Sequence, residues 1–410
     1  LIVEQRLRAL LFFCVEFEMA KTKKKQQEDD FTADLISQLN KECGTKVAYN
    51  LAYDDSPTHV NRWISTGSRQ LDTIVANHLN GGLPEGRIVE IFGPPSIGKS
   101  HIAIQLAVST QKMGGIVVYI DTENATSVEN LSLLGVDIKK RFVYVDTHCT
   151  EEVLSIAEAT IVKARAMQKD VPITIIWDSV AASSPKAELV GDYDKDSIGL
   201  QARAISKGMR KINGIIANQK VLFVCLNQIR TKIGVMYGDP TTTPGGKAIP
   251  FHSSVRIKLG AGRPIENKDK EVIGINVSAK TIKNKVAPPF RTVKFQIHFG
   301  KGIFEHEELF DELRRLDPVI KDGKEIDVSG TGAWKNFTVK DVKTGETIIS
   351  KKFYKADFGE IVDNPEYKEY IDVLIENAFV RRAEIDVDTE SYEEVRAISM
   401  ELEDEFISPE

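Results

Sequence analysis

One stretch of the sequence decides the fold, Arg87-Ile88-Val89-Glu90-Ile91-Phe92 followed by Gly93-Pro94-Pro95-Ser96-Ile97-Gly98-Lys99-Ser100. The first six residues are typical of a short buried β-strand, and the next eight match G-x4-G-K-S, the pattern of a phosphate-binding loop. Apolar residues then recur at helical spacing, at Ile102, Leu106 and Met113, and predict a helix. The motif therefore stands between a strand and a helix, which is the setting that phosphate binding requires.

The residue types of this loop indicate a nucleotide site. Gly93 and Gly98 let backbone N–H groups turn toward phosphate oxygens, and the N-terminus of the following helix adds the positive end of a dipole. We expect Lys99 to reach the β- and γ-phosphates and the Ser100 hydroxyl to ligate Mg²⁺. The residues expected to bind the nucleotide are Gly93, Pro94, Pro95, Ser96, Ile97, Gly98, Lys99 and Ser100.

A second apolar run, residues 173–178, ends in an acid. Continuous apolar runs are typical of buried parallel strands, and ligands gather at the carboxyl ends of such strands. Asp178 is therefore predicted to hold Mg²⁺ through the water shell of the metal.

Two more apolar runs also end in polar residues. Residues 116–120 precede Asp121 and Glu123, and an acid there can activate the attacking water. Residues 221–226 precede Gln228, whose amide can sense the γ-phosphate. Taken alone, each of these polar groups is better explained by a helix cap or loop solvation. Three such strand ends around one phosphate-binding loop indicate a site for phosphoryl transfer to water.

Composition excludes several classes of protein. The 410 residues carry a net charge of −6 and are 42% hydrophobic, which is typical of a folded protein of two or three domains. No apolar stretch approaches the roughly 18 residues of a membrane-spanning helix. The 4 cysteines form no C-x-x-C pair, which favours the reducing cytoplasm. The 7 histidines include no H-E-x-x-H motif, which argues against a zinc hydrolase.

Charge is unevenly distributed along the chain. Residues 203–301 hold 19 basic and 4 acidic residues, whereas residues 302–410 hold 14 basic and 29 acidic residues. A basic middle beside an acidic end suggests a polyanion-binding core with an acidic appendage. The alternative is a basic surface that only pairs with the acidic region.

The sequence resembles the RecA recombinase family between about residues 60 and 300. The runs that carry the resemblance are ISTGS (64–68), GLPEGRIVEI (82–91), DSVAA (178–182), PKAE (185–188), NQIR (227–230), KIGVMYG (232–238), TPGG (243–246) and KNK (283–285). The resemblance implies an α/β fold, a RecA-like P-loop NTPase core with a mostly parallel twisted sheet flanked by helices. It also implies a DNA-dependent ATPase that uses ATP and Mg²⁺, forms helical filaments on single-stranded DNA, and catalyses homologous pairing and strand exchange with double-stranded DNA.

The resemblance also assigns catalytic roles. Glu123 matches the catalytic base and Gln228 the γ-phosphate sensor, beside Lys99 of the loop. Lys283 and Lys285 match lysines that reach the ATP of the neighbouring subunit, where they would act like arginine fingers. Taken alone, the two lysines are better explained as an exposed hairpin with solvated charge.

Two segments match the DNA-binding loops of the family, residues 190–198 and 229–246. Their glycines and prolines predict surface loops without strand or helix. The residues expected at DNA are Arg203, Arg210 and Arg230 at phosphates, the N–H groups of Gly245 and Gly246, and Ile198 and Ile233 as wedges between bases.

Three positions depart from the family pattern. Asn130 stands where a tyrosine stacks on adenine, Pro250 where a lysine precedes the interface residue Phe251, and Lys247 where an asparagine is expected. These departures bear on nucleotide preference and on coupling between ATP and DNA.

The outer parts of the chain are predicted from composition and periodicity. Met19 is expected as the true start, with residues 1–18 as an upstream translation artefact. An amphipathic helix at 31–43 is expected to pack on the adjacent subunit or, alternatively, on its own core. The tail has 11 acidic residues against Arg396 alone, and it could compete with DNA for the basic core. The predicted divisions are 19–60 for the N-terminal segment, 61–301 for the core, 302–383 for a small α+β domain and 384–410 for the tail.

Two other functions share the phosphate-binding loop. A hexameric RecA-fold helicase or motor would form a closed ring, and a nucleotide switch that coats DNA would hydrolyse almost no ATP. The two DNA loops and the lysine hairpin favour the recombinase.

Overall fold

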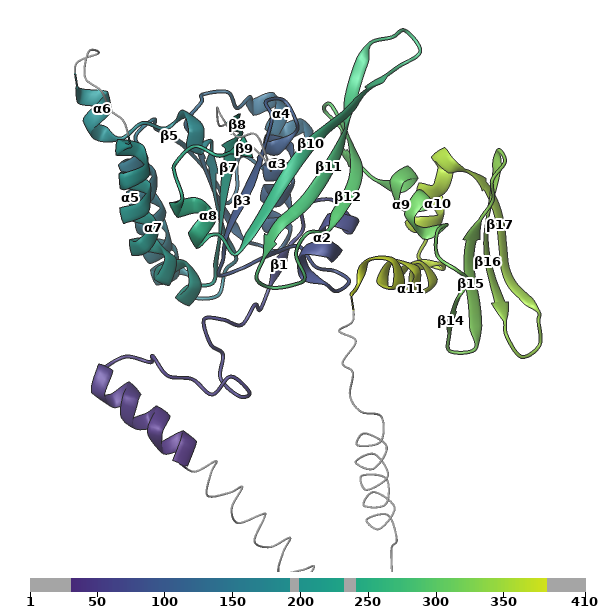
Figure 1. The fold of residues 1–410 in the computed structure, drawn as a ribbon, viewed down its shortest axis with the longest axis horizontal. Helices are drawn as coiled ribbons and strands as arrows, with labels where there is room; N and C mark the ends of the chain where they lie inside the picture. Colours follow the sequence, from purple (N-terminus) through teal and green to yellow (C-terminus); the bar gives the residue numbers. More distant parts are fainter. Residues whose placement is uncertain (1–30, 192–198, 232–240, 382–410) are drawn as a thin grey trace, which may run out of the picture.

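The computed structural model describes residues 31–191, 199–231 and 241–381. Its centre is a nine-stranded sheet in the order β13-β12-β11-β10-β3-β7-β6-β4-β5 (Figure 1). The strands are β3 (Ile88–Gly93), β4 (Ile116–Asp121), β5 (Phe142–Asp146), β6 (Ile173–Asp178), β7 (Val221–Gln228), β10 (Val255–Glu266), β11 (Val272–Asn284), β12 (Thr292–His298) and β13 (Gly302–Phe304). The strands from β10 to β5 run parallel and the other three antiparallel. The predicted α/β fold is confirmed.

Helices cover both faces of the parallel part of this sheet, which explains why β3, β4, β6 and β7 are buried along almost their whole length. Helices α2 (Arg69–Ala76) and α3 (Lys99–Lys112) pack on one face, and α5 (Thr150–Met167) and α7 (Leu200–Asn218) on the other. Side chains of β4 alternate between them, with Tyr119 in the first cluster and Val118 in the second.

The strand ends meet as the sequence predicts. Because β3, β4, β6 and β7 are parallel, their carboxyl ends share one edge of the sheet. The register sets Asp121 beside Asp178 and Gly93 beside Gln228. Strand β7 was expected to end at Leu226, but it continues to Gln228.

A second, smaller sheet follows the core. Strands β14 (Val319–Lys321), β15 (Lys324–Ser329), β16 (Trp334–Asp341) and β17 (Thr347–Tyr354) are antiparallel and in sequence order. Helices α9 (His306–Leu313), α10 (Phe358–Val362) and α11 (Lys368–Phe379) accompany them (Figure 1). Bends at residues 331–333 separate β15 from β16, and a turn at 342–344 joins β16 to β17. The domain boundary at residue 302 stays a prediction, and β13 just beyond it still pairs with β12.

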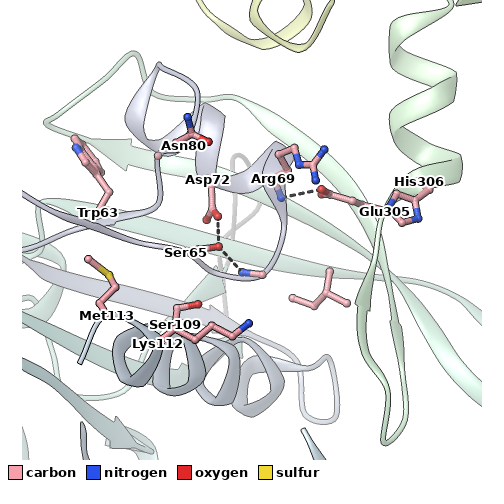
Figure 2. A pocket seen from close by; sticks show the side chains of 13 residues that line it. Trp63, Ser65, Arg69, Asp72, Asn80, Ser109, Lys112, Met113, Glu305 and His306 are labelled. Atoms are coloured by element: carbon pink, nitrogen blue, oxygen red, sulfur yellow. Dashed lines mark hydrogen bonds between the residues drawn. The ribbon is translucent and has the colours of Figure 1, made fainter. Parts of the chain in front are cut away.

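Two buried carboxylates lie where the core meets the segment that leads to this smaller sheet, and one of them, Glu305, joins the two parts. Glu305 accepts hydrogen bonds from the backbone N–H groups of Arg69 (2.8 Å) and Gln70 (3.2 Å) and from the Ser68 hydroxyl (2.6 Å), and so caps α2. Asp72 lies in the same helix and accepts from Ser65 (Figure 2). Both acids line a cavity of about 540 Å³ between α2, the end of α3 and the start of α9.

Residues 31–43 form the predicted N-terminal helix, which stands away from the core (Figure 1). Its apolar side chains Phe31, Leu35 and Leu39 are 68%, 44% and 40% exposed. The alternative that this helix packs on its own core is therefore wrong for this structure, and packing on an adjacent subunit stays a prediction.

Two further points concern the outer segments. Among the described residues, every helix is too short or too polar to cross a lipid bilayer. Residues 1–18 and the predicted acidic tail lie outside the described residues.

Candidate active site

The phosphate-binding loop joins β3 to α3. Gly98 has a φ of 94°, and a Cβ there would lie 2.2 Å from Ile297 Cδ1, so only glycine fits. Gly93 was also expected to turn the backbone toward phosphate, but its φ lies outside the left-handed region. Its missing side chain instead makes room for the Leu259 carbonyl oxygen, which would lie 2.7 Å from a Cβ.

The Lys99 side chain folds back over the loop. Its Nζ donates hydrogen bonds to the carbonyl oxygens of Pro94 (2.7 Å) and Gly93 (3.2 Å). Burial lowers the pKa of Lys99, while the charges of Asp178 and Glu123 oppose that shift. Within the described part of the chain the ammonium contacts no carboxylate directly, so an incoming phosphate can take the place of the two carbonyl groups.

Ser100 and Asp178 form the candidate metal site. The Ser100 hydroxyl donates to Asp178 Oδ2 at 2.8 Å, and Tyr119 donates to the same oxygen at 2.5 Å. Burial raises the pKa of Asp178, and the two hydrogen bonds oppose that effect. A hydroxyl and a carboxylate from separate elements match the hard oxygen ligands that Mg²⁺ prefers. These residues therefore fit the metal that the sequence predicts.

Glu123 and Gln228 also meet in the structure. Gln228 Nε2 donates to Glu123 Oε1 at 3.3 Å, and the Ser179 hydroxyl donates to the same oxygen. Asp121 accepts from the backbone N–H groups of Glu123 (2.9 Å) and Thr126 (3.0 Å), and thereby shapes the turn that carries Glu123. The carboxylate of Glu123 is exposed, whereas that of Asp178 is buried.

One pocket of about 520 Å³, a size usual for small-molecule sites, is lined by Lys99, Ser100, Asp178, Glu123 and Gln228 together. The loop supplies one wall, and the antiparallel extension of the sheet supplies an apolar wall. The lining residues are Pro95, Ser96, Ile97, Gly98, Lys99, Ser100, His101, Glu123, Asp178, Gln228, Ile275, Ile297 and Phe299. The sequence-predicted site is thus assembled, although Gly93 and Pro94 only border it.

Sequence reasoning missed two residues of this site, Tyr119 and Ser179. Each donates a hydrogen bond to a carboxylate more than fifty residues away along the chain, so no local pattern marks either residue. Ser179 directly follows Asp178, and that adjacency was the only available signal.

Lys283 and Lys285 lie at the opposite edge of the sheet. Lys283 pairs with Arg256, which pairs with Glu90, and Lys285 bonds Ser254, which bonds Ile88. Ile88 is five residues before the loop begins, so Lys285 lies about 17 Å along the strand from Gly93. Neither lysine therefore lines the pocket of its own chain.

The Lys283 ammonium is occupied in this structure. It donates to the carbonyl oxygens of Pro250 (2.7 Å) and Phe251 (2.9 Å) in the last turn of α8 (Ala248–His252). Burial and the charge of Lys285 lower the pKa of Lys283.

Several residues predicted at DNA lie near the start of α7. A Cβ on Gly245 would lie 2.8 Å from Ile205 Cδ1, and one on Gly246 would lie 2.8 Å from Ala202 Cβ. Arg203 is exposed in the same turn of α7. Arg210 lies two helical turns further on, about 10 Å away on the same face.

The second predicted loop differs in part from the expectation. Arg230–Thr231 (β8) and Thr241–Thr242 (β9) pair as two-residue antiparallel strands, where neither strand nor helix was expected. The two ends of the loop close on each other despite the glycines and prolines between them. Residues 192–198 and 232–240 lie outside the described residues, and with them Ile198 and Ile233.

Asn227 joins the loop ending at Gly246 to the sheet. Its side-chain amide donates to the Pro244 carbonyl (3.1 Å) and to Glu90 Oε1 (3.0 Å), and Glu90 also pairs with Arg256. Asn227 directly precedes Gln228 in β7. A single buried amide therefore lies between the nucleotide pocket and the predicted DNA loop.

The three departures from the family pattern are placed as follows. Asn130 lies in α4 (Val128–Leu133), where its backbone N–H bonds the Ser127 hydroxyl, and it does not line the pocket. Lys247 and Pro250 lie at α8, and Phe251 beside them is 73% exposed.

Comparison with known proteins places the chain in a family. The family model of the RecA N-terminal domain matches residues 31–304. Protein RecA of Acholeplasma laidlawii (strain PG-8A) is 37% identical over 345 residues, which are 84% of this chain and 96% of the relative. Protein RecA of Bacteroides thetaiotaomicron is 38% identical over 329 residues, 80% and 91% of the two chains. That of Symbiobacterium thermophilum is 37% identical over 329 residues, 80% and 87%. The chain therefore belongs to the RecA family of recombinases, and a ring helicase is not favoured.

Proposed function

We propose that this chain binds ATP with Mg²⁺ in the pocket between the phosphate-binding loop and β12, polymerises on single-stranded DNA, and pairs that strand with homologous duplex DNA. The observation that carries the proposal is the convergence of Lys99, Ser100, Asp178, Glu123 and Gln228 on one pocket. These five residues come from four different segments of the chain.

Each residue has a defined chemical task. Lys99 turns to the β- and γ-phosphates, and Ser100 and Asp178 would hold Mg²⁺, which neutralises charge on the phosphates. Glu123 orients the attacking water and accepts its proton as the water oxygen bonds the γ-phosphorus and ADP leaves. Its exposed carboxylate suits this task, because solvent water can reach it.

Assembly follows from the two edges of the sheet. Lys283 and Lys285 lie too far from the pocket of their own chain to reach a γ-phosphate there. Another subunit stacked head to tail would bring the two lysines of one chain to the pocket of the next. Such an interface joins unlike surfaces, so it repeats from chain to chain and gives a ring where its rotation closes and a helical filament where it does not. The filament is the form that we propose here.

DNA contact would reach the pocket through β7. Arg203, Gly245 and Gly246 present donors to phosphates without reading bases, which suits a protein that accepts any sequence. A γ-phosphate that draws Gln228 away from Glu123 would move β7 and hence Asn227, which holds the loop at Pro244.

A strand-exchange assay with and without ATP tests the proposal. The Lys99→Ala variant should lose ATP-dependent DNA binding and strand exchange, because the loop loses its only phosphate-directed charge. The matched control is Lys112→Ala at the other end of the same helix, which should behave like the unaltered protein. Strand exchange retained by Lys99→Ala would contradict the proposal.

Two further measurements separate the alternatives. Electron microscopy with DNA and a slowly hydrolysed ATP analogue should show open filaments, and closed rings would indicate a helicase-like motor. A nucleotide switch would release almost no phosphate even with single-stranded DNA present.

A further inference from the structure

Tyr119 is a buried phenol whose hydroxyl points at the candidate metal ligand. It lies on β4, is 0% exposed, and donates to Asp178 Oδ2 on the neighbouring strand at 2.5 Å. Ser100 donates to that same oxygen. Among the described residues, no group donates to Asp178 Oδ1, although Asp178 lines the pocket.

The hydroxyl is not needed to fill space. The ring of Tyr119 packs in the apolar cluster under α3 and contacts Phe142, with ring centroids 6.2 Å apart. A phenylalanine would keep these contacts, so packing alone does not account for the oxygen. A buried hydroxyl is costly unless it is bonded, and its bond here goes to a charged acceptor.

We propose that Tyr119 is a positioning residue for Mg²⁺. Its hydroxyl fixes the Asp178 carboxylate by Oδ2 and leaves Oδ1 for the water shell of the metal. This inference rests on the proposed nucleotide site, because it assigns a role to a neighbour of the metal ligand. Two donors from β4 and α3 restrict the rotation of the carboxylate, whereas Ser100 alone would leave it free to turn.

The chain offers a matched control in the next strand. Tyr144 on β5 donates to Asp121 Oδ2 at 3.1 Å, so it too bonds the carboxylate that ends a neighbouring strand, here β4. Asp121 does not line the pocket, and Tyr144 is 46% exposed. The substitution Tyr144→Phe therefore removes an equivalent hydroxyl without touching the metal site.

The test measures Mg²⁺ dependence directly. Full-length protein carrying Glu123→Gln, which should bind ATP without hydrolysing it, is combined with Tyr119→Phe or Tyr144→Phe. Affinity for a fluorescent ATP analogue is measured in EDTA and across a Mg²⁺ titration. Tyr119→Phe should need about tenfold more Mg²⁺ for half-maximal binding, because a hydrogen bond to a charged group is lost. Tyr144→Phe should match the parent protein.

Further readouts keep the inference falsifiable. Binding in EDTA should be unchanged by Tyr119→Phe, which shows that the pocket is folded. Electron paramagnetic resonance of Mn²⁺ bound with ADP should show an altered signal in Tyr119→Phe alone. An unchanged Mg²⁺ requirement, or an equal loss of affinity with and without Mg²⁺, would overturn the inference. A parent protein that binds no nucleotide at all would instead contradict the proposed function.

Discussion

Two pairs of carboxylates in the molecule use their oxygen atoms differently. At the junction with the smaller sheet, Asp72 and Glu305 accept hydrogen bonds on both oxygens. At the nucleotide pocket, donors reach only Asp178 Oδ2 and Glu123 Oε1. Within the described residues, the second oxygen of each pocket acid accepts no hydrogen bond.

This difference distinguishes acids that stabilise the fold from acids that are expected to take part in the reaction. A buried carboxylate whose two oxygens are both bonded by its own chain has little capacity left for a ligand. A carboxylate with one bonded and one unbonded oxygen is held in place and can still take a metal-bound water or a proton. Removing a pocket acid should therefore change catalysis, and removing a junction acid should change stability.

The largest expected effect is on ATP hydrolysis. Glu123→Gln should lower DNA-stimulated phosphate release by about 10²- to 10⁴-fold, because the general base is lost. Its stability should change little, since Ser179 and Gln228 can still donate to the amide oxygen. Phosphate release and thermal unfolding measure the two quantities. Glu129→Gln on the nearby α4 is the control. Hydrolysis by Glu123→Gln at the parent rate would contradict the distinction between pocket acids and junction acids.

Asp72 should show its structural role through pH. Burial raises the pKa of Asp72 to about 7. Between about pH 4 and pH 7 the folded form holds a proton that the unfolded form has lost, so this group makes the protein less stable as pH rises. Over that range its contribution falls by about 4 kcal/mol and is then constant. The substitution Asp72→Asn should remove this contribution to the pH dependence of the free energy of unfolding.

Urea unfolding of the parent and of Asp72→Asn at several pH values measures this contribution. The variant should lose less stability between pH 4 and pH 7 than the parent does. Parallel pH profiles would contradict the assignment. ATP hydrolysis at pH 7 should be similar in both proteins.

Glu305 should have a smaller effect on stability. Glu305→Ala leaves the first N–H groups of α2 without their carboxylate cap, which should lower the free energy of unfolding by about 2 kcal/mol. Glu305→Gln keeps an acceptor and should recover part of this loss. Denaturant unfolding measures both variants, and an equal stability of Glu305→Ala and the parent would show that the cap is dispensable.

The smallest effect is expected from an exposed contact across the same junction. Asp363 contacts Arg69 at 3.3 Å, with side chains 59% and 41% exposed. Asp363→Asn should change the free energy of unfolding by less than about 0.5 kcal/mol, because solvent screens the pair. A loss as large as that of Glu305→Ala would mean that exposure does not separate the two contacts.

The sequence predicts the parts of the site that lie on local patterns. The loop at 93–100 and the strand that ends at Asp178 have signatures in neighbouring residues, and both were located correctly. The phenol of Tyr119 was not predicted, because its partner Asp178 lies on another strand. Glu305 caps a helix from 237 residues away along the chain, and no periodicity reports such a distance.

The fold, like the site, is predictable where it depends on local sequence patterns and not where it depends on contacts between distant residues. Apolar runs with polar ends predict the parallel strands, but the strand order depends on contacts between distant segments. The short pairing of β8 with β9 was missed because glycine and proline signals mark loops, whereas pairing at the base of a loop depends on how its ends are anchored.

The separation of Lys285 from Gly93 along the sheet affects how many complete catalytic centres a stack of chains would contain. In the proposed filament, each chain would supply one half of two different catalytic centres, so a lone chain would have no complete centre and a stack of chains would have one fewer complete centre than members. The two ends of the stack are also chemically unlike, one bearing an uncovered loop and the other unused lysines. Growth and loss of subunits can therefore differ between the ends, and turnover per chain rises with length toward a plateau.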